Sequence, residues 1–538
     1  MSRLYEYQSK EILREGGIPI PKGGVAETPE QAARIARDIG GPVVLKIQAW
    51  VTGRAGLGGI KFASGPEEAE YLAREMLGMP VKNFVVEKIL VEEKLPIRSE
   101  YFLGLVIDDA AKSPCVIFSS MGGTGIEEIA RLHPEKVART LVDVGRGLKV
   151  YEARNLLRKT GIPHELLNPL TKVLTKFYAV AQKYDARSAE MNPLVMTEDG
   201  RFMAADCHFT VDDYAVYRHP ELGIAIAREF DRPPTPLEMI AYQVEERDHR
   251  GTFYFLQMSD NLSGDESFIG FNGAGGGGSM MSMDAVLKKG FKLANYCDTS
   301  GNPAASKVYR AAKIILSQPG IKAYFASGSG VASQEQFHSA RGLVKAFHEE
   351  GIEIPAVIRL GGNYEEEAIE ILTEYLKDLP GRVEGYGRDD SPEDCVDRLE
   401  KMIAENKSLC HELRPIPEFV PLSGAYAFAT LTGRVTIDHA KCRTCGSRGC
   451  IEACAARILT LRDGKPVLSI SEKDAEKGKC TECLACEIYC TFHEQKAITI
   501  HLPIPGLPEY REAQIRGMKA EAAGPSHPGT ETTSKRED

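Results

Sequence analysis

Short apolar runs alternate with amphipathic segments along residues 1–220 of the chain. The runs PVVLKIQAW, NFVVEKILVEE, YFLGLVIDD and PCVIFSS have the length and the β-branched content of strands. The segment TPEQAARIARDIG has a helical period, and Thr28 followed three residues later by Gln31 is typical of a capping box at its start. This alternation predicts an α/β domain over residues 1–225.

A different order, in which a strand is followed by a glycine turn and a helix, runs over residues 240–405. SFIGFN leads through GAGGGG into SMMSMDAVLKKG, and IKAYFASGSG and IPAVIRLGG are each followed by a helical pattern. Strands that alternate with helices predict a parallel sheet covered by helices on both faces. The proline-rich segment HPELGIAIAREFDRPPTPLE separates this second domain from the first.

The C-terminal part of the chain changes character again. Residues 406–433 have the composition of a second linker, and a cysteine-rich module fills residues 434–503. Residues 506–538 end in AAGPSHPGTETTSKRED, which is polar and lacks periodicity, so we expect this tail to be disordered.

Composition narrows the classes of function. A chain of 538 residues with 43% hydrophobic residues is long enough for about three domains. Its formal net charge of −10 argues against a nucleic-acid surface. The N-terminus MSRLYEYQSKEILREGG lacks the apolar core of a signal peptide, and no apolar run is long enough to span a membrane. Long α/β patterns around reduced thiols indicate a cytoplasmic protein.

Eight of the thirteen cysteines form two runs near the C-terminus. The runs are Cys442-x2-Cys445-x4-Cys450-x3-Cys454 and Cys480-x2-Cys483-x2-Cys486-x3-Cys490. A zinc site is satisfied by four ligands, often from two CxxC knuckles. The additional fourth cysteine of each run is instead typical of bacterial ferredoxins with two clusters.

In that pattern the fourth cysteine of each run ligates the cluster of the other run. We therefore expect one 4Fe–4S cluster on Cys442, Cys445, Cys450 and Cys490, and a second on Cys454, Cys480, Cys483 and Cys486. The segment ILTLRDGKPVLSIS between the runs predicts a hairpin turned at DGK. Because the first run is longer than the ferredoxin spacing and neither run is followed by proline, zinc binding and the loss of one cluster stay open as alternatives.

Two features of the first domain suit a nucleotide. Lys46 ends a predicted strand and is followed by the loop Gly53-Arg54-Ala55-Gly56, whose backbone N–H groups could contact phosphates beside the lysine ammonium. A hairpin turn with a surface lysine is the alternative. Further on, Asn192 and Asp206 lie on two predicted strands joined by a turn at EDG, and their oxygens are ligands that Mg²⁺ prefers.

Residues 1–400 resemble the β subunit of succinyl-CoA synthetase, a family of acid–CoA ligases that form ADP or GDP. The resemblance is carried by the stretch from Tyr5 to Lys61 and by ILVEE, SEYFLG, EMNPLV, FNGAG, AAKIILSQPGIKA and VIRLGGN. It implies an ATP-grasp domain, then a flavodoxin-like domain with parallel α/β structure, and, with the cysteine module, a final small α+β ferredoxin-like domain. It also implies ATP, Mg²⁺ and CoA.

The resemblance assigns roles residue by residue. Nucleotide contacts fall on Lys46, Gly53, Arg54, Ala55, Glu92 and Glu100. Mg²⁺ ligands fall on Asn192 and Asp206, and Glu190 matches the glutamate that steadies a phosphohistidine of the partner subunit. The family's contacts with the acid substrate correspond to Asn272 and to the backbone of Gly330, Val331 and Ala332. Trp50, Ala55 and Gly56 depart from the family pattern, as does Ser333, so we expect a changed acid specificity.

The resembled family keeps its phosphohistidine and CoA-binding fold on an α subunit, and no such segment is evident in this chain. We therefore expect a separate α-like partner subunit, which supplies the phosphohistidine and the CoA-binding fold for reaction with an organic acid. Gly275–Gly278, at a predicted helix start, suit an anion or form only a tight turn. A redox partner protein is expected for the clusters. The alternative function is an electron-transfer subunit in which the ligase fold is a scaffold or an ATP-gated switch.

Overall fold

In the computed structural model, the four apolar runs predicted as strands in the first domain all contain strands. They are β3 (Val43–Ile47), β6 and β7 (Phe84–Val85 and Ile89–Glu93), β8 (Ile97–Asp108) and β9 (Ser113–Ser119). The predicted helix is α2 (Pro29–Ile39), where the Thr28 side chain accepts from the Gln31 N–H. The Gln31 side chain accepts from the N–H of Glu27, one residue before the position that a capping box requires.

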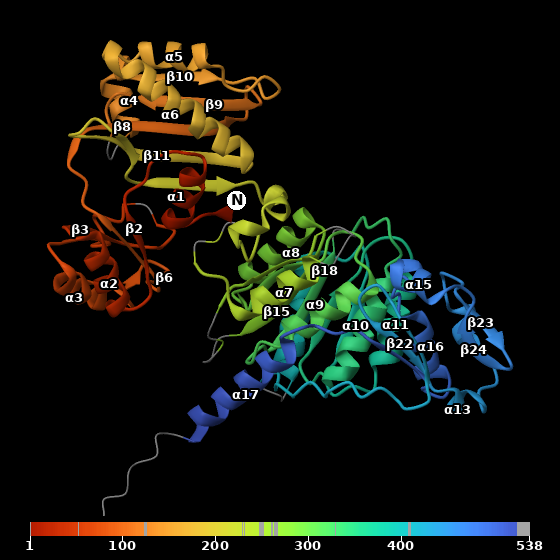
Figure 1. The fold of residues 1–538 in the computed structure, drawn as a ribbon. Helices are drawn as coiled ribbons and strands as arrows, with labels where there is room; N and C mark the ends of the chain where they lie inside the picture. The colour runs from red at the N-terminus through yellow and green to blue at the C-terminus, as the bar shows by residue number, and fades with distance from the viewer. Residues whose placement is uncertain are drawn as a thin grey trace, which may run out of the picture. The chain divides into compact units, whose positions relative to one another are not determined.

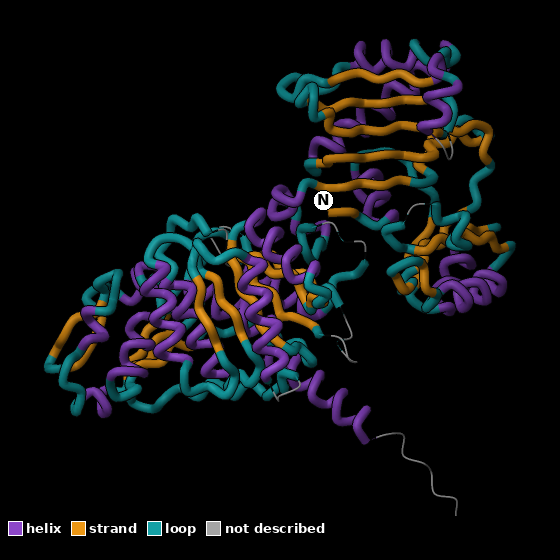
Figure 2. Tube along the Cα trace, turned by 180° about the vertical axis from the view of Figure 1, so that it is seen from behind, coloured by secondary structure: helices purple, strands orange, loops and turns teal. Residues whose placement is uncertain are grey.

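The chain divides into two compact units, Met1–Pro234 and Thr235–Asp538. Figure 1 shows the helices and strands of each unit, and Figure 2 shows the same elements from behind. The described residues are 2–51, 53–122, 126–228, 230, 232–246, 252–259, 262, 267–328, 330–406 and 410–523. No helix among them is long and apolar enough to cross a membrane.

The first unit contains the two-stranded antiparallel pair β5-β6 and two larger antiparallel sheets. The smaller one has the order β2-β7-β3-β4 and packs against α2 and α3 through alanine-rich helix faces. The larger one has the order β1-β13-β11-β8-β9-β10, with β12 paired to β11, and packs against α1, α5 and α6. The remaining bounds are β1 (Ser2–Arg3), α1 (Glu6–Glu15), β2 (Gly23–Ala26), β4 (Ile60–Ala63), α3 (Pro66–Met76), β5 (Pro80–Val81), α4 (Ile126–Leu132), β10 (Val137–Leu141), α5 (Val150–Arg158), α6 (His164–Lys183), β11 (Ala186–Thr197), β12 (Phe202–Ala204) and β13 (Cys207–Val211).

The second unit is built on a sheet of order β14-β17-β15-β18-β19-β20, with β16 paired to β15. The pairs from β15 through β20 are parallel, as predicted, and β14 is an antiparallel edge strand. The strands are β14 (Tyr254–Gln257), β15 (Phe268–Ala274), β16 (Lys292–Leu293), β17 (Asn295–Asp298), β18 (Ala323–Gly328), β19 (Ala356–Arg359) and β20 (Val383–Tyr386).

Helices cover both faces of this sheet, because successive side chains of a strand point to opposite faces. In β18, Phe325 packs with α8 and α12, whereas Tyr324 and Ala326 belong to the core formed with α9, α10 and α11. The helices are α7 (Pro236–Glu246), α8 (Gly276–Lys288), α9 (Ala305–Ile315), α10 (Phe337–Glu350), α11 (Glu365–Leu376) and α12 (Pro392–Glu405).

The cysteine-rich module begins earlier than residue 434 and is not a separate body. Its sheet has the order β21-β22-β25, and β21 (Tyr426–Ala429) comes from the predicted linker. The predicted hairpin forms at Asp463 and Gly464, both with positive φ. The module shares one hydrophobic core with the parallel sheet. Its other elements are β22 (Arg434–Ile437), α13 (His439–Cys442), α14 (Gly449–Glu452), β23 (Leu459–Arg462), β24 (Lys465–Leu468), α15 (Glu472–Asp474), α16 (Ala485–His493) and β25 (Ile498–His501).

The expectation of a disordered tail over residues 506–538 is wrong for its first half. Helix α17 spans Leu507–Ala523, and Arg511 near its start is 1% exposed. The Arg511 guanidinium donates to Glu350 at 2.8 and 2.9 Å and to the Ser317 hydroxyl at 2.7 Å. One buried ion pair therefore anchors a helix whose sequence has weak periodicity. Residues 524–538 lie outside the described part of the chain.

Candidate functional site

A buried network of ion pairs surrounds Lys46 at the end of β3. The Lys46 ammonium lies 2.8 Å from Glu6 Oε1 and 3.0 Å from Glu92 Oε2. Lys10 contacts the same two carboxylates, at 2.8 Å to Glu6 and 2.5 Å to Glu92. Arg54 completes the network at 2.7 Å from Glu6 Oε2. Lys46 is therefore not the surface lysine of the alternative interpretation.

The contacts in this network keep Glu6 and Lys46 ionised. Burial opposes ionisation of Glu6, but the cations of Lys10, Lys46 and Arg54 outweigh it and hold the pKa of Glu6 well below its ordinary value. Burial likewise opposes the charge on Lys46, and the carboxylates of Glu6 and Glu92 outweigh it, so the pKa of Lys46 is raised. The ammonium stays charged at neutral pH, as contact with phosphate requires.

Asn192 and Asp206 are brought together as predicted. The Asn192 N–H donates to the Asp206 carbonyl at 3.1 Å, because the strand containing Asn192 runs beside the turn between β12 and β13. The Asp206 carboxylate accepts from Arg54 through both oxygens at 2.9 Å. The side-chain oxygen of Asn192 is buried and has no hydrogen-bond partner. An amide oxygen without a partner and a carboxylate, on residues whose backbones are hydrogen-bonded to each other, are donor types that fit Mg²⁺.

The glycine loop closes on itself by short turns. The Gly56 N–H donates to the Gly53 carbonyl at 3.0 Å, and the Gly58 N–H donates to the Ala55 carbonyl at 3.1 Å. Gly53 has φ of 70°, which favours glycine. The network residue Glu92 lines a cavity of about 410 Å³ together with Lys10. Glu100 is exposed on β8, opposite Val195 of β11.

Glu190 lies in the middle of the larger sheet of the first unit. It is paired in register with His208 on one side and with Gly104 on the other. Its side chain lines a cavity of about 300 Å³ that is also lined by Glu6, Arg54 and His208. One cavity therefore joins the predicted position for a phosphohistidine with the cation network. Trp50 stacks on Tyr5 with ring centroids 5.0 Å apart, as expected for a packing residue.

The residues expected to contact the acid lie at the carboxyl ends of β15 and β18. Asn272 is 5% exposed; its Nδ2 donates to the Tyr324 hydroxyl at 3.0 Å, while its Oδ1 is buried without a partner. The loop after β18 contains Gly330, with φ of 78°, and Val331, which is 82% exposed. Ala332 forms an isolated parallel bridge with Gly362.

This loop rests on a buried guanidinium. Arg359 donates to the Gly328 carbonyl at 2.8 Å and to the Arg388 carbonyl at 3.1 Å, so it ties two loops at the same sheet edge. The loop before α9 joins them, since Asn302 Nδ2 donates to the Ser333 hydroxyl at 2.9 Å. The resulting sheet edge is held by hydrogen bonds from three loops.

The glycine turn before α8 lies at the same edge. Gly275 has φ of 95°, and its N–H donates to Asp298 at 3.1 Å. A Cβ added to Gly276 or Gly277 would meet nothing within 4 Å, so both face open space. Backbone N–H groups in the first turn of a helix have no partner within the helix. The turn is open enough to accept a ligand, and Asp298 fixes its shape.

The eight thiols of the module fall into two sets of electrostatic neighbours. The first set is Cys442, Cys445, Cys450 and Cys490, and the second is Cys454, Cys480, Cys483 and Cys486. Burial and then the other three thiols of its set raise the pKa of Cys450 to about 12. Burial and then the other three thiols of the second set raise the pKa of Cys486 well above its ordinary value.

The loop of the second cysteine run contains residues with positive φ. Glu482 and Leu484, between the cysteines of the second run, have φ of 52° and 62°, which turns the loop tightly around the thiols. The Ala497 N–H donates to Cys490 Sγ at 3.1 Å. No group of three or more His, Cys, Asp or Glu in the described part of the chain has an arrangement that could already hold a metal ion. Two clusters therefore stay a prediction.

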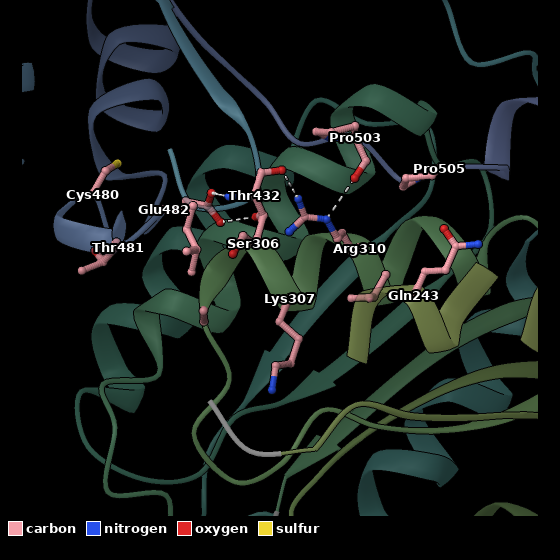
Figure 3. Close-up of a pocket in the computed structure, with 14 residues that line it drawn as sticks. Gln243, Ser306, Lys307, Arg310, Thr432, Cys480, Thr481, Glu482, Pro503 and Pro505 are labelled. Atoms are coloured by element: carbon pink, nitrogen blue, oxygen red, sulfur yellow. Dashed lines mark hydrogen bonds between the residues drawn. The ribbon is translucent and has the colours of Figure 1, made fainter. Parts of the chain in front are cut away.

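Hydrogen bonds tie the loop of the second run to helix α9 (Figure 3). Glu482 accepts from the Thr432 N–H at 2.8 Å and from the Thr432 hydroxyl at 2.6 Å. The Thr432 carbonyl accepts from Arg310 of α9 at 3.0 Å, and Arg310 also donates to the Pro503 carbonyl at 3.2 Å. The figure shows these side chains around a pocket that Cys480 also lines.

The fold and this site define an ATP-grasp ligase. Residues 3–196 match the model of the ATP-grasp domain family, and residues 265–398 match the family described as ATP citrate lyase citrate-binding. ATP citrate lyase from Methanothrix soehngenii, solved with citrate and coenzyme A, has a TM-score of 0.62, with 19% identity over 74% of this chain and 99% of that one. At this identity the likeness shows the fold alone.

Relatives at higher identity narrow the family. The GDP-forming succinate–CoA ligase subunit beta of Thermus thermophilus is 39% identical over 69% of this chain and 93% of its own length. The ADP-forming subunit beta of Staphylothermus marinus is 38% identical over 69% and 93%. The chain belongs to the family of succinate–CoA ligase β subunits, and it is an acid–CoA ligase of the ADP-forming type. Neither family match extends beyond residue 398.

Sequence reasoning missed Glu6 and Lys10, which complete the network around Lys46. The two residues are four apart on α1, so they lie on one face of that helix. Both are 2% exposed, which is rare for charged side chains unless they are paired. The signal available in the sequence was an oppositely charged pair with i,i+4 spacing on the helix face that also carries Leu13.

Proposed function

We propose that this chain is the β-like subunit of an ATP-dependent acid–CoA ligase and that it carries a two-cluster 4Fe–4S module for electron transfer. The ligase half rests on the family to which the chain belongs and on one observation, the buried network in which Lys46 contacts Glu6 and Arg54 contacts both Glu6 and Asp206. The iron–sulfur half rests on the two sets of four thiols. Each set contains three cysteines of one run and the fourth cysteine of the other run, as in ferredoxins with two clusters.

In the proposed ligase, Lys46 and the loop Gly53–Ala55 bind the phosphates of ATP, and Glu92 and Glu100 contact the rest of the nucleotide. Asn192 and Asp206 hold Mg²⁺, which neutralises phosphate charge during transfer. The phosphoryl group passes to a histidine of an α-like partner subunit, and Glu190 steadies that histidine in the cavity it shares with Arg54.

The second unit provides the site for the acid. Asn272 and the backbone of Gly330, Val331 and Ala332 bind a carboxylate, and the match to a citrate-binding family supports this assignment. The partner supplies the phosphoryl group and CoA, whose thiolate displaces phosphate from the acyl phosphate. The reaction is thereby divided into several displacements through covalent intermediates, each of which is easier than a single direct step.

ADP formation by the chain together with its α-like partner tests the ligase half. ADP is expected only when ATP, CoA and an organic acid are all present. Asp206→Ala removes a metal ligand and is expected to abolish this turnover without changing the iron content. Asp199→Ala is the matched control, because Asp199 is an exposed aspartate that contacts Thr197 and Arg201 in a turn. ADP formation by the Asp206 variant at the rate of the unsubstituted protein would refute the assignment.

An electron-transfer subunit with the ligase fold as a scaffold or ATP-gated switch is the second candidate. The core that the cysteine module shares with the parallel sheet favours it, since these two parts belong to one compact unit. The two functions differ in one observable. A scaffold gives no acid-dependent ADP across a broad panel of acids, yet ATP changes the rate at which reduced clusters are reoxidised.

A further inference from the structure

The two sets of thiols have different surroundings. The second set faces the domain of the parallel sheet: the guanidinium of Arg341 on α10 interacts with Cys483 and Cys486, and 16% of the Arg341 side chain is exposed. A cavity of about 220 Å³ is lined by Cys483 together with Ala304 and His338 of the same domain. The second set therefore lies beside the parallel-sheet domain, with Cys480, Cys483 and Cys486 partly exposed.

The first set lies on the outer side of the module. The loop that carries Cys445 is exposed at Arg443, Thr444, Gly446 and Ser447. The charged groups that interact with Cys442 are Arg448 and Asp438, which both belong to the module itself. A partner molecule can reach this loop without moving any element of the parallel sheet.

The rim of this loop is basic. No aspartate or glutamate occurs between Asp438 and Glu452, whereas Lys441 and Arg443 are exposed. The Lys441 ammonium donates to the Lys496 carbonyl at 3.4 Å, which brings a further exposed lysine to the same side. We call Lys441, Arg443 and Lys496 the basic rim.

The nearby carboxylates are held by other groups. Asp438 caps α13 by accepting from the N–H groups of Ala440 and Lys441 at 3.0 and 3.4 Å. Glu494 accepts a hydrogen bond from the Ser447 hydroxyl. The local positive charge contrasts with the net charge of −10 of the whole chain, so it is not a general property of this surface.

We propose that the first cysteine set is the outer redox centre, that the basic rim docks an acidic electron-carrier protein, and that the second set is the inner centre beside the ligase domain. The inference rests on the proposed iron–sulfur module. One electron passes from the reduced carrier to the outer cluster; the carrier is oxidised by one electron, the cluster is reduced by one, and no covalent bond forms or breaks. The inner cluster then exchanges that electron with the outer one.

Physical chemistry makes this docking distinguishable from ordinary solvated lysines. A patch of one sign raises the association rate of an oppositely charged partner by about 10- to 1000-fold at low salt, and the gain disappears as ionic strength rises. If these lysines have no docking role, reversing their charge is expected to leave the rate of electron transfer unchanged. The salt dependence of the rate is therefore the quantity to measure.

The test mixes the full protein with electron carriers in a stopped-flow instrument under anaerobic conditions. The double variant Lys441→Glu/Arg443→Glu is compared with Lys377→Glu/Lys401→Glu, which changes the same charge at exposed positions near the ends of α11 and α12. The protein carrier is an acidic bacterial ferredoxin reduced with dithionite. Hexaammineruthenium(III) is a small cationic electron acceptor, so its charge is opposite to that of the acidic ferredoxin.

Reduction by the acidic ferredoxin at low salt is expected to slow by about tenfold in the rim variant, with the loss disappearing at high salt. Oxidation of the reduced variant by hexaammineruthenium(III) is expected to become faster, and the control variant to behave like the unsubstituted protein. Equal rates for both variants and the unsubstituted protein, with full reduction by excess dithionite, would overturn the docking inference alone. Absence of any paramagnetic cluster signal in the reduced, unsubstituted protein would instead overturn the proposed iron–sulfur module.

Discussion

Protonation of His411 is expected to destabilise the second unit as the pH falls. The side chain is 4% exposed, its Nε2 has no hydrogen-bond partner, and it lies in a segment that the sequence predicted as a linker. Burial lowers the pKa of His411 from 6.5 to about 4; Glu350 opposes this effect, and the guanidinium groups of Arg511 and Arg414 add to it. The folded state therefore binds this proton less readily than the unfolded state does.

The sign and size follow from linkage. Because the pKa is depressed in the folded state, the contribution of the neutral imidazole is fully present above about pH 6.5 and is lost as pH falls toward 4. With about 1.4 kcal/mol for each pH unit between the two pKa values, the unfolding free energy decreases by about 2.5 kcal/mol between pH 7.5 and 4.5. Carboxylates titrate mostly below this range.

Urea denaturation followed by circular dichroism at a series of pH values measures this decrease. The variant His411→Gln cannot take up the proton, so its stability is expected to change far less over the same range, and the difference between the two curves isolates the histidine. His133→Gln is the control, because His133 is half exposed at a helix end in the first unit. Parallel pH profiles for His411→Gln and the unsubstituted protein would show that the imidazole is not buried as described.

Three further changes probe other parts of the structure. Arg511→Ala, which breaks a buried ion pair, is expected to lower the unfolding free energy by about 3–5 kcal/mol, while exposed Arg516→Ala on the same helix changes it by less than about 0.5 kcal/mol in the same urea assay. The pKa of Glu384 is lowered to about 2 by hydrogen bonds from arginine, so its contribution is present above about pH 4.5 and lost as pH falls toward 2; Glu384→Gln removes that pH dependence. Gly361→Ala would place a Cβ 2.5 Å from the Gly330 Cα, so we expect the KM for the acid to rise by about tenfold in steady-state assays, and an unchanged KM would contradict the assignment of that loop.

Local patterns along the sequence predicted several of the elements. The strands Val43–Ile47 and Ala323–Gly328 are short apolar runs bounded by turn residues, and their periodicity was sufficient. Helix Leu507–Ala523 was not predicted, because it is anchored by contacts with distant segments: Arg511 binds Glu350 and Ser317, and Leu507 is buried in the shared core. Part of segment 406–433 packs against the core although its composition is that of a linker, because Phe428 is buried there and β21 pairs with β22.

In the candidate site, too, the features set by local sequence could be predicted and the long-range contacts could not. Asn192 and Asp206 were brought together by a hairpin whose turn the sequence contains, so their proximity could be predicted. The contacts of Lys46 with Glu6 and of Arg54 with Asp206 join different elements, and spacing along the chain carries no signal of them. Helix α9 and the second cysteine run are likewise connected through Arg310 and Thr432, a contact between distant segments.

The most direct test of the proposed ligase activity measures ADP released by the anaerobically purified complex of this chain with its α-like partner, across a panel of carboxylic acids. We predict that at least one acid gives sustained ADP formation from ATP, and that omission of either that acid or CoA stops it. Failure of every acid in the panel, or ADP formation that proceeds equally without acid and CoA, would contradict the conclusion that this chain works as an acid–CoA ligase.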